Sequence, residues 1–410
     1  MKRPSILQII TILLSGSILA GCSKSNPNPT PKNAVTITSI DVNTGPYYTM
    51  VTISGTGFSS IPANDQLFFN GKAAIVGIAT ATSLYTYVPL GAGTGNITLS
   101  VNNGATVTGP VFTYQVAEVV SPVAGSLGTI GSANGIGNAA SFFQPLGIAV
   151  DASGNLYIAD TNNNLIRRIT PDGTVTTFAG GSSAGFNEPG GIAVDAAGNI
   201  YVADTNNNLI KKITPTGQIS AIIDASTGKA ANITSPESVA IDKSGDIFVV
   251  SQRTFIKEIT PAGVITTIPS SNSDSFYGLA IDASGDLFSA DPQGNHIYKI
   301  APGGPVVIFA GNSSIIGGDI DGTGKNASFY MPQNVAVDAN NNVYVADNGN
   351  ETIREITPAA VVTTVGGNAG SSPYGPVSKA LFAGVTAIAC DNAGNTFIVR
   401  GNEIDKISTQ

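Results

Sequence analysis

An internal repeat is the feature of this sequence that most constrains how the chain can fold. Between Pro145 and Gly181, apolar runs alternate with short clusters of Asn, Asp, Gly and Pro, and the same pattern returns five more times before the C-terminus. The Asp that closes the motif IAVD marks each copy, and the copies follow one another at intervals of roughly 40 to 56 residues, a period typical of propellers and solenoids. These marker residues are Asp151, Asp195, Asp242, Asp282, Asp338 and Asp391.

Each copy contains the residues for four short strands and three turns. In the first copy the runs are GIAV, LYIAD, LIRRI and TVTTFAG, which are rich in the β-branched and aromatic side chains that favour strands. The residues between the runs tolerate positive φ and occur at hairpin spacing. Because such a sheet cannot bury both of its faces alone, the copies are expected to stack around a ring. The sequence therefore predicts an all-β chain that contains a six-bladed β-propeller.

The two ends of the repeat region complement each other. The last copy, from Val385 to Gln410, supplies only three strands, whereas the segment from Glu118 to Ser126 resembles the final strands of other copies without the three that should precede it. Pairing this segment with the last copy would remove two exposed sheet edges. We therefore expect an N-terminal strand to close the sixth blade of a propeller that spans residues 117–410.

The recurring pattern P-x-G-I-A-V-D-x-x-G-N-L-Y-I-A-D, followed by N-x-I-R-R-I, resembles the NHL repeat. The linker at residues 321–332 and its echo at residues 134–145 are similar to linkers of the same family. Two copies depart from the pattern, because Ser251 replaces the Asp of IAD in the third copy and Arg400 replaces it in the sixth.

The first residues have the features of a bacterial lipoprotein signal. Lys2 and Arg3 precede an apolar stretch that is too short to span a membrane, and the tetrapeptide Leu-Ala-Gly-Cys that ends at Cys22 resembles the lipobox. The resemblance implies a signal peptide over residues 1–21 and lipid on Cys22; an ordinary export signal with an incidental Cys is the alternative. Residues 22–33 then form the lipidated end and a flexible tether. The protein is expected in the cell envelope, lipid-anchored to the outer membrane on its periplasmic or external face.

Residues 34–115 follow a different pattern, in which short alternating runs between Gly, Asn and Pro turns predict a small β-sandwich. The segment from Val51 to Phe58, VTISGTGF, and the turn from Phe69 to Gly71 are similar to the IPT/TIG domain. That resemblance implies an immunoglobulin-like fold. A spacer between the membrane and the propeller is the expected role, with ligand binding by this domain as the alternative.

The composition argues against one class of partner. Charged residues make up only 11% of the chain, the formal net charge is −8, and Lys and Arg are scattered mainly over the third strands of the copies. Because nucleic acid binding needs a clustered basic face, nucleic acid is not an expected partner. Cys22 is assigned to lipid and Cys390 lies in a predicted inner strand, so no disulfide is expected.

Acidic residues and one His are the candidates for metal chemistry. The Asp at the end of the second strand recurs in most copies, which favours a turn cap that accepts backbone N–H groups over a calcium ligand. The positions are Asp160, Asp204, Asp291 and Asp347. The segment from Asp319 to Asp321 opens like a calcium loop but lacks its distal acidic residues, and His296, the only His, fits a packing role. We predict no catalytic residue, metal or cofactor, with calcium as the open alternative.

Aromatic side chains recur just before the inner strands of four copies. Four Phe at one repeat position are expected in the core between blades, namely Phe142, Phe186, Phe329 and Phe382. The next position varies, and its two large aromatics, Phe143 and Tyr330, are candidates for stacking on a sugar or a peptide at the mouth of the central channel. The absence of Trp weakens the case for a strong carbohydrate platform.

Positions that differ between copies are free of a shared structural role, so specificity is expected there. The residue just after the Pro position of the repeat, where the chain enters each inner strand, is such a position. In a propeller the six should surround one channel mouth, on the face of the Asp160 and Asp204 loops. They are Leu146, Gly190, Glu237, Tyr277, Gln333 and Thr386. Glu237, Tyr277 and Gln333 should form an arc that suits a neutral, hydroxyl-rich or amide-bearing ligand. The alternative is that all six are unconstrained solvent positions.

These features favour a lipid-anchored extracytoplasmic binding or scaffold protein, whose propeller face contacts a glycan, a peptide or an envelope protein. The alternative is a metal-dependent enzyme that resembles the NHL-type lyases or lactonase-like hydrolases, with its site in the central channel. Such sites generally draw on acidic residues, Asn and often His that converge at the axis, and the sequence shows no such non-repeating cluster. A purely structural role in an envelope complex is a third possibility.

Overall fold

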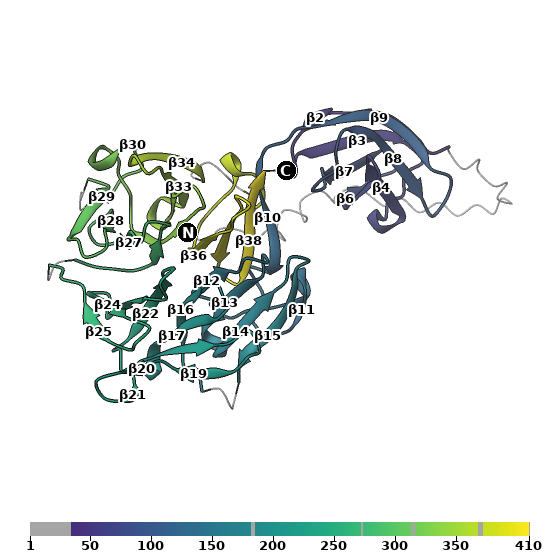
Figure 1. Cartoon of the computed structure of the whole chain (residues 1–410). Helices are drawn as coiled ribbons and strands as arrows, with labels where there is room; N and C mark the ends of the chain where they lie inside the picture. Colours follow the sequence, from purple (N-terminus) through teal and green to yellow (C-terminus); the bar gives the residue numbers. More distant parts are fainter. Residues whose placement is uncertain (1–33, 182–184, 272–273, 313–315, 368–371, 410) are drawn as a thin grey trace, which may run out of the picture.

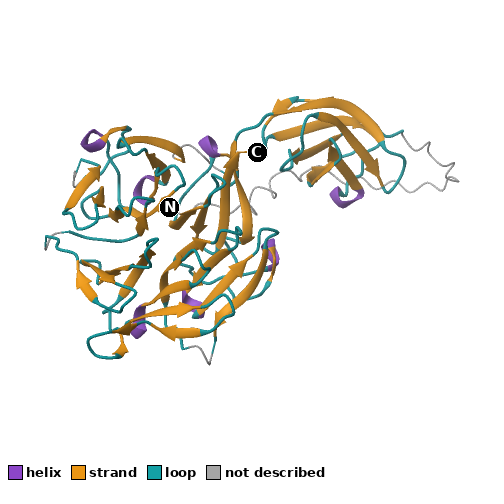
Figure 2. Ribbon diagram, in the orientation of Figure 1, coloured by secondary structure: helices purple, strands orange, loops and turns teal. Residues whose placement is uncertain are grey.

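The computed structural model describes residues 34–181, 185–271, 274–312, 316–367 and 372–409. The expected signal peptide, Cys22 and the tether lie outside these residues. Two all-β units follow one another along the described chain (Figure 1, Figure 2). No helix in the described ranges is long and apolar enough to cross a membrane.

The N-terminal unit is a sandwich of two sheets with the strand orders β1-β3-β7-β6 and β2-β9-β8-β4-β5. The strands are β1 (Thr36–Ile40), β2 (Thr44–Gly45), β3 (Met50–Thr56), β4 (Asp65–Phe69), β5 (Lys72–Ala74), β6 (Val76–Ala79), β7 (Ser83–Tyr87), β8 (Gly95–Val101) and β9 (Val107–Tyr114). A 3-10 helix, η2 (Pro62–Asn64), precedes β4.

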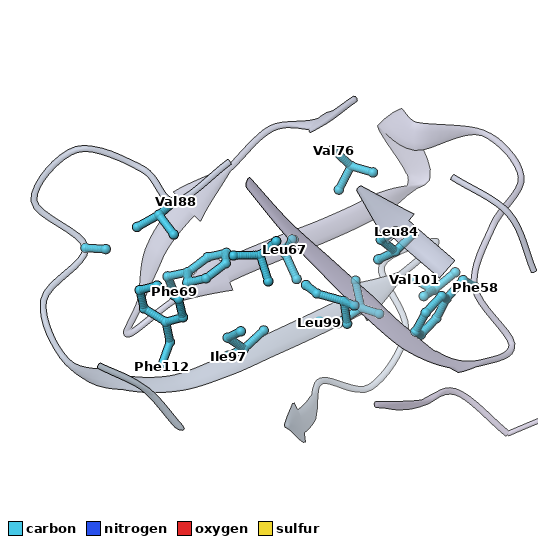
Figure 3. Packing of buried hydrophobic residues seen from close by; sticks show 13 residues of the cluster. Phe58, Leu67, Phe69, Val76, Leu84, Val88, Ile97, Leu99, Val101 and Phe112 are labelled. Atoms are coloured by element: carbon cyan, nitrogen blue, oxygen red, sulfur yellow. The ribbon is translucent and has the colours of Figure 1, made fainter. Parts of the chain in front are cut away.

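The alternation predicted for this unit places one face of each sheet in a shared core. In β3, Val51 and Ile53 are buried whereas Met50 lies on the surface. Figure 3 shows the core cluster, in which the rings of Phe69 and Phe112 lie edge to face with their centroids 5.2 Å apart. The predicted β-sandwich is confirmed.

The second unit contains six further sheets of four or five strands among the described residues. In each, the first three strands pair in sequence order from the inner strand outward, and in three sheets the outer edge includes a strand that comes earlier in the chain than the inner strand. The first is β12 (Gly147–Val150), β13 (Leu156–Asp160), β14 (Leu165–Ile169) and β15 (Thr174–Gly180), with β11 (Gly135–Ile136) on its outer edge. The second is β16 (Pro189–Val194), β17 (Ile200–Asp204), β18 (Leu209–Ile213) and β19 (Ile219–Ala221). The third is β22 (Pro236–Ile241), β23 (Ile247–Ser251), β24 (Phe255–Ile259) and β25 (Ile265–Thr267).

The remaining sheets follow the same plan. The fourth is β26 (Leu279–Ile281), β27 (Leu287–Asp291), β28 (His296–Ile300) and β29 (Val306–Ala310). The fifth is β31 (Pro332–Val337), β32 (Val343–Asp347), β33 (Thr352–Ile356) and β34 (Val361–Gly367), with β30 (Gly322–Thr323) on its outer edge. The sixth is β36 (Val385–Cys390), β37 (Thr396–Arg400), β38 (Glu403–Thr409) and β10 (Glu118–Gly125), with β35 (Gly375–Pro376) on its outer edge. We call these sheets blades 1 to 6.

Short elements connect or extend the blades. A two-stranded hairpin of β20 (Ile223–Asp224) and β21 (Lys229–Ala230) follows blade 2. The 3-10 helices are η3 (Gly137–Ala139), η4 (Thr161–Asn163), η5 (Thr205–Asn207), η6 (Gly324–Asn326), η7 (Asn348–Asn350) and η8 (Val377–Lys379).

The inner strands close the blades into a ring. Each inner strand packs against the inner strand of the next blade, and β36 of blade 6 packs back against β12 of blade 1. The strand β10 completes blade 6 by pairing antiparallel with β38, from Glu118 opposite Thr409 to Gly125 opposite Glu403. The predicted propeller is confirmed, and its last blade takes its outer strand from the N-terminal side of the repeat region.

Buried aromatic side chains fill the spaces between blades, as the repeat predicted. Phe142, at 0% exposure, packs with Ala387 and Val399 of blade 6 although it belongs to the start of blade 1. Phe186, Phe329 and Phe382 are buried in the same way. Cys390 ends the inner strand of blade 6, and burial raises the pKa of its thiol to about 12.

Candidate functional site

The Asp residues that recur at the ends of the second strands form buried ion pairs. The Asp160 carboxylate accepts hydrogen bonds from the Arg167 guanidinium (2.8 Å), the Asn163 amide (2.9 Å) and the backbone N–H of Phe143 (2.8 Å). The pair recurs as Asp204 with Lys211 and as Asp347 with Arg354. The structural role is as predicted, but for these three residues the turn-cap interpretation needs correction. The N–H group comes from the linker before the inner strand, and a basic side chain shares the carboxylate.

The other candidates for metal chemistry have structural partners as well. Asp291 accepts the N–H groups of Gln293 and Gly294 and so caps its own loop. The Asp321 carboxylate pairs with the buried Arg354 at 2.7 Å. His296 is buried with its ring edge to face against Tyr298, with centroids 4.6 Å apart, which agrees with the predicted packing role. Within the described ranges, no three His, Cys, Asp or Glu side chains gather in a way that could hold a metal ion.

The starts of the six inner strands surround a cavity of about 550 Å³, which we call the mouth. All six of the positions singled out from the repeat line it, namely Leu146, Gly190, Glu237, Tyr277, Gln333 and Thr386. Thr161 and Thr205, which follow Asp160 and Asp204, line it too, so these loops lie on the predicted face. The comparison of the copies therefore located a real concave surface.

Three threonine hydroxyls at the mouth join neighbouring blades. Thr161 of blade 1 donates to the carbonyl of Pro189 at the start of blade 2 (2.8 Å), and Thr205 of blade 2 donates to Pro236 of blade 3 (2.7 Å). Thr386 of blade 6 donates to Pro145, just before blade 1 (3.2 Å). These hydroxyls serve the ring, and Thr386 is itself one of the six variable positions. The other variable side chains at the mouth are the groups available to a ligand.

Arg253 is the mouth residue that the sequence argument missed. In blade 3, where Ser251 replaces the usual Asp, the turn after β23 places both Gln252 and Arg253 at positive φ (55° and 54°). The Arg253 Nε lies 2.5 Å from the Glu237 carboxylate, and its Nη1 donates to the Tyr277 hydroxyl at 3.0 Å. Its guanidinium carbon also lies 4.6 Å from the centre of the Tyr277 ring. The predicted arc therefore contains an ion pair instead of a lone acid.

The adjacent blade 5 carries neutral amides at the mouth. Gln333 and Asn334, at the start of β31, both line the cavity. Within the described part of the chain, neither side chain has a hydrogen-bond partner, so both amides can donate to and accept from a bound molecule. Glu188 and Arg253 complete the charged lining, and with Glu237 they leave the mouth slightly negative.

Phe143 and Tyr330 are not among the residues that line the mouth. The N–H of Phe143 donates to the Asp160 carboxylate and that of Tyr330 donates to Asp347. These hydrogen bonds fix both residues beside the C-terminal end of the second strand of their blade. Tyr330 packs there against Gly349, where an added Cβ would lie 2.5 Å from the Tyr330 ring. Their expected place at the mouth is corrected on this ground, because the hydrogen bonds to Asp160 and Asp347 hold both residues in the linkers that precede the inner strands, outside the cavity lining.

The described chain thus defines a β-propeller protein with an N-terminal immunoglobulin-like sandwich. Comparison with protein families shows which kind of each is present. The IPT/TIG domain matches residues 35–114, and the NHL repeat matches residues 142–169, 186–213 and 329–355. The chain therefore combines an IPT/TIG domain with NHL repeats, as the resemblances in the sequence implied.

Several solved structures share this two-part architecture. A protein of unknown function from Bacteroides thetaiotaomicron VPI-5482 is 22% identical with a TM-score of 0.62, over 93% of this chain and 99% of that chain. An auxiliary nutrient binding protein from the same organism is 19% identical with a TM-score of 0.64, again over 93% and 99%. An auxiliary nutrient binding protein from Bacteroides ovatus ATCC 8483 is 19% identical with a TM-score of 0.61, over 93% and 99%. At these identities the likeness establishes the fold. A comparison with proteins of curated function finds no match.

Proposed function

We propose that the protein is a lipid-anchored extracytoplasmic binding protein whose propeller mouth takes a neutral, hydroxyl-rich or amide-bearing ligand, such as a glycan or a peptide. The observation that carries this proposal is the mouth itself, where all six non-repeating positions converge on one cavity of about 550 Å³. Its volume lies in the ordinary range for small-molecule sites. The similar fold of two nutrient binding proteins supports the binding class.

The charges at the mouth favour a neutral ligand over an anion. Arg253 already pairs with Glu237 at 2.5 Å, so its charge is largely compensated, and Glu188 adds a further negative group. A neutral hydroxyl or amide can accept from the guanidinium N–H groups that remain and bind the amides of Gln333 and Asn334. Such hydrogen bonds are lost on mutation at a cost of about 1–3 kcal/mol each when a charged group takes part.

We expect Arg253→Ala and Tyr277→Ala each to weaken ligand binding about 10-fold to 100-fold, because each removes a directional contact at the mouth. Glycan and peptide arrays would identify the ligand, and titration calorimetry would measure the affinity. Lys243→Ala is the matched control, since Lys243 is an exposed cation on a turn outside the mouth lining. If both mouth variants stay folded and bind as tightly as the parent, the mouth is not the site. Chemical conversion of a bound ligand would favour the enzyme alternative.

We expect Cys22→Ala to abolish lipid attachment, because thioether formation requires that sulfur. The precursor should escape globomycin-sensitive processing and leave the membrane fraction, whereas the mouth should keep its ligand affinity. Fractionation of cells that carry the parent or the variant, followed by immunoblotting, tests this. Unchanged membrane association of the variant would contradict the lipobox interpretation. Cys390→Ala is the control, because Cys390 lies inside blade 6.

A further inference from the structure

The IPT/TIG sandwich contacts the propeller through a cluster of tyrosines. Tyr48, which follows β2, stacks on Tyr87 of β7 with centroids 4.4 Å apart and an interplanar angle of 11°. On its other side Tyr48 meets Tyr374, which precedes β35 of blade 6, edge to face at 5.8 Å. Tyr47 adds a third ring from the sandwich, 5.5 Å from Tyr48. Aromatic pairs in these geometries are stabilising beyond the area they bury.

The backbone of blade 6 comes close to the sandwich at the same place. Gly375 of β35 pairs with Val120 of β10, so it forms the outer edge of the blade. Its φ is +104°, and an added Cβ would lie 3.1 Å from the Cβ of Tyr48. A side chain at this position would be strained and would crowd Tyr48, so glycine here permits a close approach of the two units.

Behind Tyr374 lies a buried cluster of charges. Arg400 pairs with Asp405 at 2.6 Å and with Glu403 at 3.3 Å, and all three side chains are at most 3% exposed. The Tyr374 hydroxyl donates a hydrogen bond to Glu403. Buried charges need partners, and two carboxylates share one guanidinium here. The Tyr374 hydroxyl therefore gives Glu403 a second hydrogen-bond donor.

This cluster reverses the polarity found in other blades. In blade 1 the acid Asp160 ends the second strand, and Arg167 faces it from the third strand, opposite Ile158. In blade 6 the base, Arg400, ends the second strand, and Asp405 occupies the place opposite Ile398 that corresponds to Arg167. Glu403 is an additional acid at the start of β38. The reversal therefore occurs in the blade that contacts the sandwich, and it creates the acceptor for Tyr374.

We propose that the blade 6 cluster, acting through Tyr374 and Tyr48, holds the IPT/TIG domain against the propeller as one rigid body. The tether precedes β1, and Thr36 of β1 pairs with Thr56 at the end of β3 that lies away from Tyr48. The anchored end of the sandwich is thus opposite the end that contacts blade 6. A rigid junction fixes the direction of the mouth relative to the membrane, which a flexible linker would leave free.

Tyr48→Ala in the full chain tests the proposal without altering the charge cluster. We expect amide hydrogen exchange in residues 372–380 to become about tenfold faster, because loss of the two ring contacts favours opening of the junction. Small-angle scattering should show one orientation for the parent and a broader distance distribution for the variant. Tyr85→Ala is the matched control, since Tyr85 is an exposed tyrosine on the same sheet.

Tyr374→Phe tests the role of the charge cluster, because it keeps the ring and removes only the hydroxyl that donates to Glu403. Faster exchange in residues 372–380 with this variant would assign part of the stability of the junction to the charge cluster. Three results would overturn the proposal. They are a parent that scatters as a range of orientations, a Tyr48→Ala variant that exchanges and scatters like the parent, and a Tyr85→Ala variant that loosens the junction equally.

Discussion

A chain that lacks residues 118–124 is expected to lose its folded propeller. Those residues form most of β10, and the side chains of Val119, Val120 and Ala124 are fully buried in blade 6. Burial of the two valines alone contributes about 3–6 kcal/mol, a large share of the roughly 5–15 kcal/mol that stabilises an ordinary domain. Removal also leaves β38 as an exposed edge. Soluble yield and calorimetric melting of the deletion variant measure the effect.

A transplanted strand supplies the control for this deletion. In the antiparallel pairing Glu118 lies opposite Thr409, so a short turn after the C-terminus could lead directly into a copy of residues 118–125. We expect the chain with the strand moved to that place to recover the melting transition of the propeller. A deletion variant that melts like the parent would show that β10 is dispensable, and a transplant that fails to fold would show that its N-terminal connection matters more than its pairing.

Arg400→Ala is expected to destabilise the propeller by about 3–5 kcal/mol, because it leaves Glu403 and Asp405 buried beside each other without their cation. Both Asp405 and Arg400 are almost fully buried, so solvent cannot screen the loss. Chemical denaturation of parent and variant measures the difference. Lys406→Ala is the matched control, since it removes a cation from the neighbouring strand β38. Lys406 is only partly buried, so its loss should cost about 1 kcal/mol or less.

The loss caused by Arg400→Ala should shrink as the pH falls. Burial raises the pKa of both Asp405 and Glu403 in the folded protein. The folded state therefore holds more protons on these groups than the unfolded chain does. Their contribution to the free energy of unfolding is fully present below the pKa values of the unfolded chain, and it is lost as the pH rises through the pKa values of the folded protein. A deficit that is equal at pH 4 and pH 8 would mean that the cluster does not carry the effect.

The repeat made the architecture predictable, because one pattern repeated six times constrains strands, turns and stacking together. The same comparison found the mouth, since Glu237, Tyr277 and Gln333 differ from copy to copy whereas the motif that follows them hardly varies. Phe143 and Tyr330 were misplaced by that reasoning. A variable position indicates freedom from the shared architecture, but it does not say how far the residue lies from the ring axis.

Arg253 and Asp405 show what the repeat concealed. The departures at Ser251 and Arg400 are visible in the sequence. Each lies in a blade where the usual Asp ion pair is absent and a different ion pair is present. The partners are not visible, because a turn at positive φ aims Arg253 into the mouth and a shortened hairpin brings Asp405 beside Arg400. The unusual residue can be recognised in the sequence, whereas its partner depends on the local backbone.

The pairing of β10 with β38 also sets an order of events during biosynthesis. The first strand of the propeller emerges before any blade, and its partner belongs to the last residues of the chain. The IPT/TIG sandwich can fold on contacts within residues 34–115, whereas the ring cannot close until β38 has been synthesised. A chain that stops even one strand short presents two open sheet edges, so incomplete products are exposed to proteases and aggregation while finished ones are not.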